Sequence, residues 1–289
     1  REMISILLFA TGVIVLVAST YDFLYTTISL TGLGPISLRL TRGLWLVARK
    51  LTRISEQRAG VSLRSAIGPT ILSVLAAFWM ALFLMGYVML YVSGASLQTS
   101  SLHEPANLVE IIAFAGSTLS TLGASTVEPT NGWWDILSMV AAINGMVVLT
   151  LSVTFVLNIL QTTLAARSWA MRYNALMDAA DARQSDHTPA NITSLGPELC
   201  NITVKFTASP LTGYFVPNDS AMSFPKAISH LCNLMEAQDR TQLPRDMKPD
   251  DLVELRTGLS VFGRHIRSHR GEGDFASVRA WAYDHSLPA

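Results

Sequence analysis

The chain has 289 residues, of which half are hydrophobic and 15% are charged, with 21 basic and 21 acidic residues. Soluble domains usually contain about 25% charged residues, so this composition favours a membrane protein and excludes an intrinsically disordered chain. The net charge of zero excludes a general nucleic-acid binder, which is strongly basic.

Three stretches are long and apolar enough to cross a bilayer, which requires about 20 residues in a helix. They are centred on residues 3–21, 71–92 and 136–160. We expect residues 1–30 to form a peripheral transmembrane helix, because they lack the basic n-region and the clear cleavage site of a signal peptide. They also lack the arginine ladder that a voltage sensor carries.

The distribution of positive charge predicts the orientation in the membrane. Residues 31–66 contain seven lysine or arginine residues and one acid, whereas residues 65–166 contain neither lysine nor arginine. Short loops rich in lysine and arginine stay on the cytoplasmic side. We therefore expect the N-terminus and the loop between the second and third spans outside the cell, and the C-terminal part inside.

The basic segment also predicts a contact with lipid. Residues 36–53 place leucine side chains, Val47 and Trp45 among several arginines. This mixture suits a helix that lies in the headgroup layer, so residues 36–64 are expected to meet anionic lipid. The alternative is an ordinary cytoplasmic connector.

Between the second and third spans, the apolar run of residues 108–119 is about 18 Å long as a helix. This length is too short to cross a membrane and is typical of a re-entrant segment. We expect Ser101 and Glu104 to cap the helix, with Pro105 in its first turn. Small and hydroxyl residues follow, so the predicted layout is an outer helix, a half-helix, an extended return strand and an inner helix, as in a pore loop.

Residues 118–129, TLSTLGASTVEP, resemble the signature of the two-helix, pore-loop potassium channels, whose filter reads TVGYG with a proline a few residues later. Thr121, Leu122 and Gly123 match the first three filter positions, and Pro129 falls at the proline spacing. In that family, backbone carbonyl groups of the filter replace the hydration shell of the ion.

The filter that the resemblance implies, Thr121 to Ser125, departs from the family pattern. Ala124 replaces the aromatic residue, Ser125 replaces the second glycine, and Thr126 stands where aspartate is usual. A serine in a left-handed conformation costs about 1 kcal/mol. We therefore expect a pore for monovalent cations, K+ or Na+, with a filter that is wider, less selective or partly collapsed.

The resemblance covers residues 71–161 and implies a homotetramer, because one pore loop per chain cannot enclose a filter. Gly145 falls where the family commonly carries its inner-helix hinge, although a close helix contact is the alternative. Four residues on one face of the third span are candidates for the pore lining or gate, or else pack against the second span. They are Met146, Thr150, Val153 and Leu157.

Four acids lie in or beside the outer loop, and no basic residue offsets them. They are Glu104, Glu110, Glu128 and Asp135. Carboxylates at the mouth of a pore raise the local concentration of cations.

The C-terminal part, residues 162–289, reads as soluble sequence and is expected to form a bundle of about 100 residues, large enough for its own core. It contains no phosphate-binding glycine motif and no metal-ligand spacing, so no cofactor is expected and its partner is not specified by the sequence. The expected elements are a continuing helix over 162–183, a linker over 185–196, a short strand within 198–206, and helices over 224–239 and 250–267.

The expected fold is an all-α membrane protein with three transmembrane helices, a re-entrant pore helix with a filter loop, and a mainly α-helical cytoplasmic domain. Its predicted segments are residues 1–30, 31–66, 67–161 and 162–289. The predicted function is a homotetrameric cation channel without enzymatic activity or a nucleic-acid partner. The alternative is a non-conducting, membrane-anchored sensor or scaffold with a vestigial pore loop.

Overall fold

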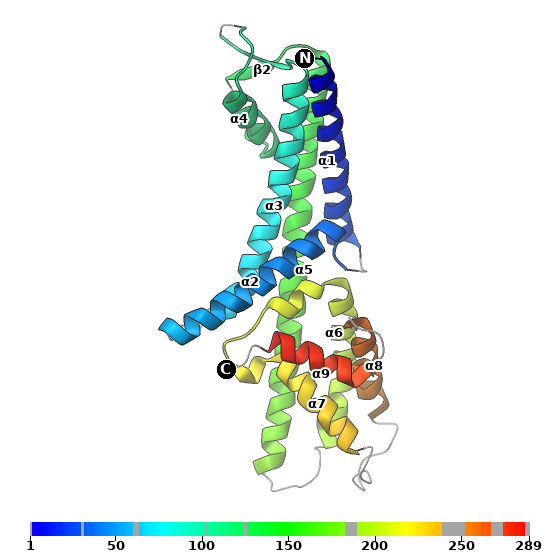
Figure 1. Ribbon diagram of the computed structural model, residues 1–289. Coiled ribbons are helices and arrows are strands. Elements are labelled where there is room, and N and C mark those ends of the chain that lie inside the picture. The colour runs from blue at the N-terminus through cyan, green and yellow to red at the C-terminus, as the bar shows by residue number, and fades with distance from the viewer. Residues whose placement is uncertain are drawn as a thin grey trace. The chain divides into compact units, whose positions relative to one another are not determined.

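The computed structural model describes residues 2–29, 32–59, 64–101, 103–123, 126–182, 190–238, 252–266 and 274–286 (Figure 1). Helices dominate the described chain. The elements are α1 Glu2–Ile28, α2 Pro35–Ala59, α3 Arg64–Ser93, β1 Leu97–Thr99, α4 Leu108–Leu119, β2 Val127–Pro129, α5 Gly132–Ala182, η1 Ala190–Leu195, α6 Gly196–Ala208, η2 Pro210–Tyr214, η3 Ser220–Met222, α7 Phe224–Gln238, α8 Val253–Ile266 and α9 Asp274–His285.

Helices α1, α3 and α5 are long and apolar enough to cross a membrane, over Glu2–Ile28, Ser65–Ser93 and Gly132–Ala179. The three predicted spans are therefore confirmed as membrane-capable helices. Helix α5 has 51 residues, or about 77 Å at 1.5 Å per residue. The apolar core of a bilayer is about 30 Å thick, so a large part of α5 must extend beyond it.

The chain divides into two compact units. The first comprises residues 1–29, 33–41 and 72–156, and the second comprises residues 30–32, 42–71 and 157–289. Helices α2, α3 and α5 contribute residues to both units. Each unit has its own interior and is described by itself.

In the first unit, glycines bring α1 and α3 close together, and the two helices lie side by side in Figure 1. A Cβ added at Gly12 would lie 3.0 Å from the carbonyl oxygen of Gly86, and one added at Gly86 would lie 2.7 Å from Leu16. Small residues allow this kind of backbone approach between membrane helices.

Aromatic side chains fill the centre of the same unit. Trp79 of α3 is 1% exposed and meets Phe23 of α1 at a centroid distance of 5.0 Å and Phe155 of α5 at 6.0 Å. Both contacts have the inclined, edge-to-face geometry that aromatic pairs prefer. Trp79 therefore joins all three long helices.

A buried carboxylate attaches the start of α2 to α1. Asp22 is fully buried, and its carboxylate accepts hydrogen bonds from the backbone amides of Ile36 (2.8 Å) and Ser37 (3.2 Å). The Ser37 hydroxyl and the indole N–H of Trp79 (3.3 Å) also donate to it. An acid at a helix N-terminus is stabilised by the free amide groups and the helix dipole. The sequence shows Asp22 only as the first charge after an apolar run.

Two short strands depart from the all-α expectation. β1 and β2 pair antiparallel, with Gln98 opposite Glu128 and Thr99 opposite Val127. Part of the predicted extended return is therefore a strand that pairs with residues preceding α4. The mostly helical class is confirmed, whereas the strand pair was not predicted.

The second unit is a helical domain built around the late part of α5. Trp169 and Tyr173 stack at 5.5 Å, and Phe206 of α6 meets Phe224 of α7 and Phe262 of α8 at 5.3 and 5.4 Å. The edges and faces of these rings form one hydrophobic core. Burial of such large rings is a main source of stability for a small domain.

The strand predicted within residues 198–206 is wrong, because these residues belong to α6. Leu199, Ile202 and Phe206 are buried at the three- and four-residue spacing of a helix. The β-branched residues in this segment favour a strand by propensity, and the tertiary packing overrides that preference. The predicted helices over 162–183, 224–239 and 250–267 agree with α5, α7 and α8, whereas α9 and the 3-10 helix η1 within the predicted linker were not predicted.

Candidate functional site

Helix α4 begins at Leu108, the first residue of the predicted apolar run, but this start lies after the expected first turn at Pro105, and a different pair caps the helix. The amide of Glu110 donates to Asn107 Oδ1 (3.0 Å), and the amide of Asn107 donates to Glu110 Oε2 (2.8 Å). This reciprocal arrangement is a capping box. The predicted Ser101–Glu104 cap is wrong, because Pro105 forms an isolated bridge with Gln98 and the helix begins only after it.

One face of α4 packs into the first unit. Ile111, Phe114, Ala115 and Leu119 are buried along that face. Phe114 contacts Tyr91 of α3 edge-to-face, with ring centroids 5.5 Å apart. The opposite face of α4 is exposed at Val109 and Ile112.

The C-terminal end of α4 packs directly on the backbone of α5 at Gly145. A Cβ added at Gly145 would overlap the carbonyl oxygen of Leu119 and lie 2.7 Å from its carbonyl carbon. Helix α5 continues without a break through Gly145. Of the two roles that the sequence left open for this glycine, a hinge or a close contact, the structure shows the contact.

The residues after α4 close the helix through a Schellman motif. The amide of Leu122 donates to the Ser117 carbonyl (3.0 Å), and the amide of Thr121 donates to the Thr118 carbonyl (3.0 Å). Thr121 has φ +57° and occupies the left-handed position where glycine is usual. This conformation is strained for a β-branched residue.

The structure places three of the five predicted filter residues. Thr121, Leu122 and Gly123 are exposed, and Leu122 has a relative accessibility of 73%. Gly123 has φ +70°, a conformation that a residue with a Cβ resists, and no atom lies within 4 Å of the Cβ position. Ala124 and Ser125 lie outside the described residues.

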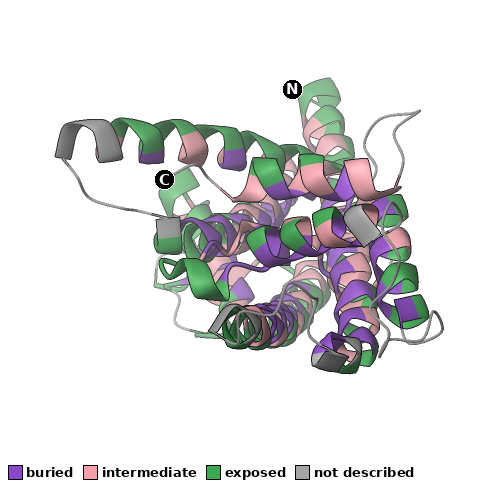
Figure 2. Cartoon of the chain, turned by 90° about the horizontal axis from the view of Figure 1, so that it is seen from below, coloured by how far each residue is buried: buried purple, intermediate pink, exposed green. Residues whose placement is uncertain are grey.

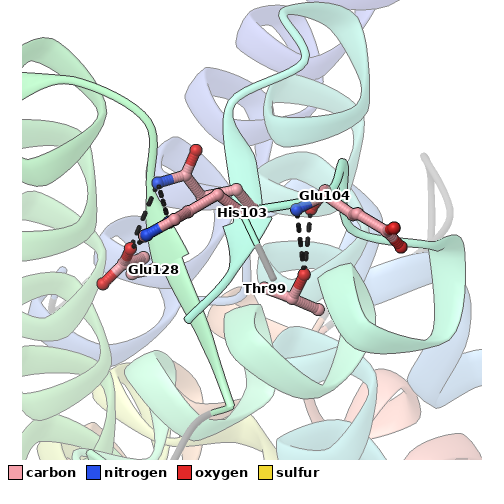
Figure 3. Close-up of polar contacts among 5 residues, drawn as sticks. Thr99, His103, Glu104 and Glu128 are labelled. Atoms are coloured by element: carbon pink, nitrogen blue, oxygen red, sulfur yellow. Dashed lines mark hydrogen bonds and ion pairs between the residues drawn. The ribbon is translucent and has the colours of Figure 1, made fainter. Parts of the chain in front are cut away.

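The predicted outer-mouth acids have different environments, and Figure 3 shows two of them, Glu104 and Glu128. Glu128 on β2 accepts a hydrogen bond from the Gln98 side-chain amide (3.1 Å) and lies 3.4 Å from His103 Nδ1. The Gln98 side-chain nitrogen is also 3.1 Å from the same His103 nitrogen. The sequence analysis missed His103 and Gln98, which the pairing of β1 with β2 brings to Glu128.

Glu104 does not join this cluster. Its backbone carbonyl accepts from the Thr99 amide (2.9 Å) and its amide donates to the Thr99 hydroxyl (3.1 Å), while its carboxylate points away from Glu128 in Figure 3. Asp135 is exposed in the first turn of α5, where the helix dipole favours an acid. Glu110 is engaged in the capping box, so Glu104 and Asp135 present the freest carboxylates of the four.

The predicted lining residues of α5 share an exposed face. Met146, Thr150, Val153 and Leu157 are all exposed, whereas the opposite face is buried at Val148, Phe155 and Ile159. The exposed face also carries Thr154 and Asn158. The threonine hydroxyls donate to carbonyls one turn earlier, and the Asn158 side chain has no hydrogen-bond partner within the described chain.

Helix α2 presents three faces along its length, and in Figure 2 most of its surface is exposed. Its buried stripe consists of Ser37, Thr41, Trp45 and Thr52. At 3.6 residues per turn, an exposed basic face lies on one side of that stripe and an exposed apolar face on the other. The basic face comprises Arg39, Arg42, Lys50 and Arg53 with the exposed Leu46 among them, and the apolar face comprises Val47, Leu51 and Ile54.

Within the described chain, no group of three or more histidine, cysteine, aspartate or glutamate residues could hold a metal ion. The chemistry of the loop is instead that of backbone carbonyls, hydroxyls and separate carboxylates.

Comparison with known proteins supports a membrane protein and leaves its activity open. No protein-family model matches the chain, and no solved structure matches it. The chain is 30% identical over 216 residues to a Bacillus subtilis (strain 168) protein described as uncharacterized membrane protein YdjJ. The match covers 71% of this chain and 61% of that protein, so the chain spans less than two thirds of the relative's length. Together with the three apolar helices, this similarity identifies the chain as a membrane protein.

Proposed function

We propose that the chain is one subunit of a homotetrameric channel that conducts monovalent cations, K+ or Na+. The proposal rests on the course of the backbone over residues 97–145. Gly145 lies 13 residues after the start of α5, about 20 Å along that helix, and the end of α4 contacts it there. The chain then returns in seven residues to β2, which pairs with β1. Helix α4 is too short to span a membrane, and the segments before and after it, β1 and β2, lie side by side. This is the layout of a re-entrant pore helix.

The end of α4 suits a cation. The C-terminus of a helix carries a partial negative charge, and the proposed filter follows it directly. The Schellman bonds use the amide groups of Thr121 and Leu122 and do not involve the carbonyl oxygens of these residues, which we propose as ligands for an ion. Such carbonyls, one set from each of four chains, are the ligands of a cation filter.

The exposed face of α5 suits an inner cavity. Thr150, Thr154 and Asn158 would face lipid on a monomer. The helix backbone satisfies the two threonine hydroxyls, but an amide such as that of Asn158 is costly in contact with acyl chains. In a tetramer with α5 innermost, the same side chains face a water-filled cavity, with Met146 and Leu157 among them. The unpartnered Asn158 amide then hydrogen-bonds to water or to a neighbouring subunit.

The orientation follows from the basic residues. With α2 on the cytoplasmic side, the β1–β2 pair and the exposed carboxylates of Glu104 and Asp135 lie at the outer mouth, where they attract cations. The helical domain after α5 then lies in the cytoplasm.

The faces of α2 suit the surface of the inner leaflet. Its apolar face inserts beside the acyl chains and its basic face meets anionic headgroups, while the buried stripe holds the helix to the protein. Native mass spectrometry of the full chain should show retained phosphatidylglycerol that is lost when Arg39, Arg42, Lys50 and Arg53 are replaced by Gln. A control that replaces Lys205, Lys226 and Arg264 of the second unit should retain it, and equal loss from both would contradict a specific α2 contact.

Flux through liposomes tests the channel. Proteoliposomes should release K+ down its gradient, and Gly123→Val should abolish the release because valine resists a φ of +70°. The control Gly132→Ala, whose Cβ meets no atom within 4 Å, should conduct like the parent. Intact tetramers that release no K+ would contradict the proposal and favour a membrane-anchored sensor or scaffold.

A further inference from the structure

A small, partly open cavity lies in the second unit, lined by residues of α5, α6, η2, η3, α7 and α9 and of the segments between them. Its volume is about 20 Å³. Arg167 of α5 and Thr212 of η2 provide polar groups in its wall, and Trp281 and His285 of α9 provide aromatic ones. A void of this size has room for a water molecule or a single monatomic ion.

Two residues of the cavity wall each carry a buried polar atom that lacks a hydrogen-bond partner. Arg167 Nε and Thr212 Oγ1 are both buried, and neither is hydrogen-bonded within the described chain. Thr212 is 4% exposed, so bulk water does not satisfy its hydroxyl. Arg167 makes a long contact to the Phe215 carbonyl (3.5 Å) through Nη2, which leaves Nε–H unused. A buried donor without an acceptor costs about 1–3 kcal/mol.

The charge in the cavity wall is also unbalanced. The guanidinium of Arg167 stays protonated in proteins, and none of the residues lining the cavity is a carboxylate. Among the described residues, Arg167 forms no ion pair, in contrast to Arg172 five residues later, which pairs with Glu198. A partly desolvated charge without a counter-ion is unfavourable.

We propose that this cavity binds a small monovalent anion of halide size, such as chloride. The anion accepts hydrogen bonds from Arg167 Nε and from the Thr212 hydroxyl and balances the guanidinium charge, which a water molecule does not do. The small volume favours a monatomic anion over phosphate and other tetrahedral oxyanions. Because the two donors belong to α5 and η2, the bound anion stabilises the packing of η2 on the helix that leaves the membrane.

Thermal unfolding of the full chain in detergent tests this site. At constant ionic strength, replacing gluconate by chloride or bromide should raise Tm saturably by about 3 °C. Thr212→Val and Arg167→Gln should each remove the halide-dependent rise. Thr212→Ser, which keeps the hydroxyl, and Arg172→Gln, which leaves the cavity intact, should retain it.

The crystallographic counterpart is anomalous diffraction from crystals in bromide. A bromide peak within hydrogen-bond distance of Arg167 Nε and Thr212 Oγ1 is the expected result. A water molecule at that position in saturating bromide would overturn the proposal, as would a halide effect on Tm that survives in Thr212→Val. These readouts do not involve ion flux, so they stand or fall independently of the proposed channel.

Discussion

The carbonyl group of Leu119, the last residue of α4, occupies the space where a side chain at Gly145 would begin. Leu119 is 3% exposed, and α5 continues through Gly145 as an unbroken helix. The C-terminal end of α4 therefore packs directly against the backbone of α5. In the proposed channel, this contact sets the depth at which the filter begins.

Replacement of Gly145 by alanine should displace the end of α4. The added methyl group overlaps the Leu119 carbonyl, and such overpacking costs about 1–3 kcal/mol. Thermal unfolding in detergent should show the loss, together with a smaller fraction of tetramer on size-exclusion chromatography. The control Gly132→Ala lies on the same helix in open space and should change stability by less than about 0.5 kcal/mol. Equal stability of the two variants would show that the Leu119–Gly145 contact is absent.

Removal of the Asp22 carboxylate should loosen the start of α2. Asp22→Ala leaves the amides of Ile36 and Ser37 and the indole of Trp79 without this acceptor, so we expect a loss of about 2–3 kcal/mol. Trypsin should then cleave the basic residues of α2 faster in the intact protein. Thr11→Val on the same helix is the control, because the Thr11 hydroxyl bonds only within its own turn. Unchanged cleavage in Asp22→Ala would rule out this anchoring role.

The second unit should lose stability in acid through His285. Burial lowers the pKa of His285 below the usual value of about 6.5, and the nearby Arg49 lowers it further, while Trp281 and Asp284 partly oppose the shift. The folded state therefore binds fewer protons than the unfolded state below pH 6.5, so stability is full above this pH and falls as the pH drops toward the folded pKa.

Unfolding followed from pH 7.5 to pH 5.5 measures this dependence. His285→Gln should reduce the dependence of stability on pH only in part. Burial lowers the pKa of His265 as well, so His265 also makes the protein less stable as the pH falls. A variant in which stability falls as steeply with pH as in the parent would contradict a lowered pKa of the half-buried His285.

The two cysteines should differ in reactivity. Burial raises the pKa of Cys232 to about 12, and its side chain is inaccessible, so both the thiolate fraction and access are small. Cys200 is partly exposed, with a pKa raised by burial and by Glu254. A maleimide at pH 7.5 should label at most Cys200 in the native chain and both thiols after denaturation. Mass spectrometry that finds Cys232 labelled at the rate of the denatured chain would contradict the packing of α7.

Hydrophobic length and helical period were sufficient to predict the three long apolar helices and α4, but not α6 or α9. The three apolar helices and α4 follow from long runs of apolar residues, which need no knowledge of their neighbours. The α6 segment shows the limit of this approach, because its β-branched residues favour a strand until Leu199 and Phe206 pack against other helices.

The contacts of the candidate site could not be predicted from the sequence and are seen only in the structure. The capping role of Asn107, the cluster of His103 with Glu128 and the network of Asp22 all join residues through backbone geometry that residue spacing does not encode. The amides that Asp22 accepts from lie 14 and 15 residues away, beyond the reach of any local pattern.

The reversal potential of the reconstituted protein tests the central claim most directly. In a KCl gradient, we expect currents whose reversal potential lies near the K+ equilibrium potential and away from the Cl− equilibrium potential. Replacing K+ by Na+ on one side should shift that potential only modestly, because Ala124 and Ser125 replace the aromatic residue and the second glycine of a potassium filter. Currents that reverse at the chloride equilibrium potential, or intact tetramers that carry no current, would contradict a cation pore.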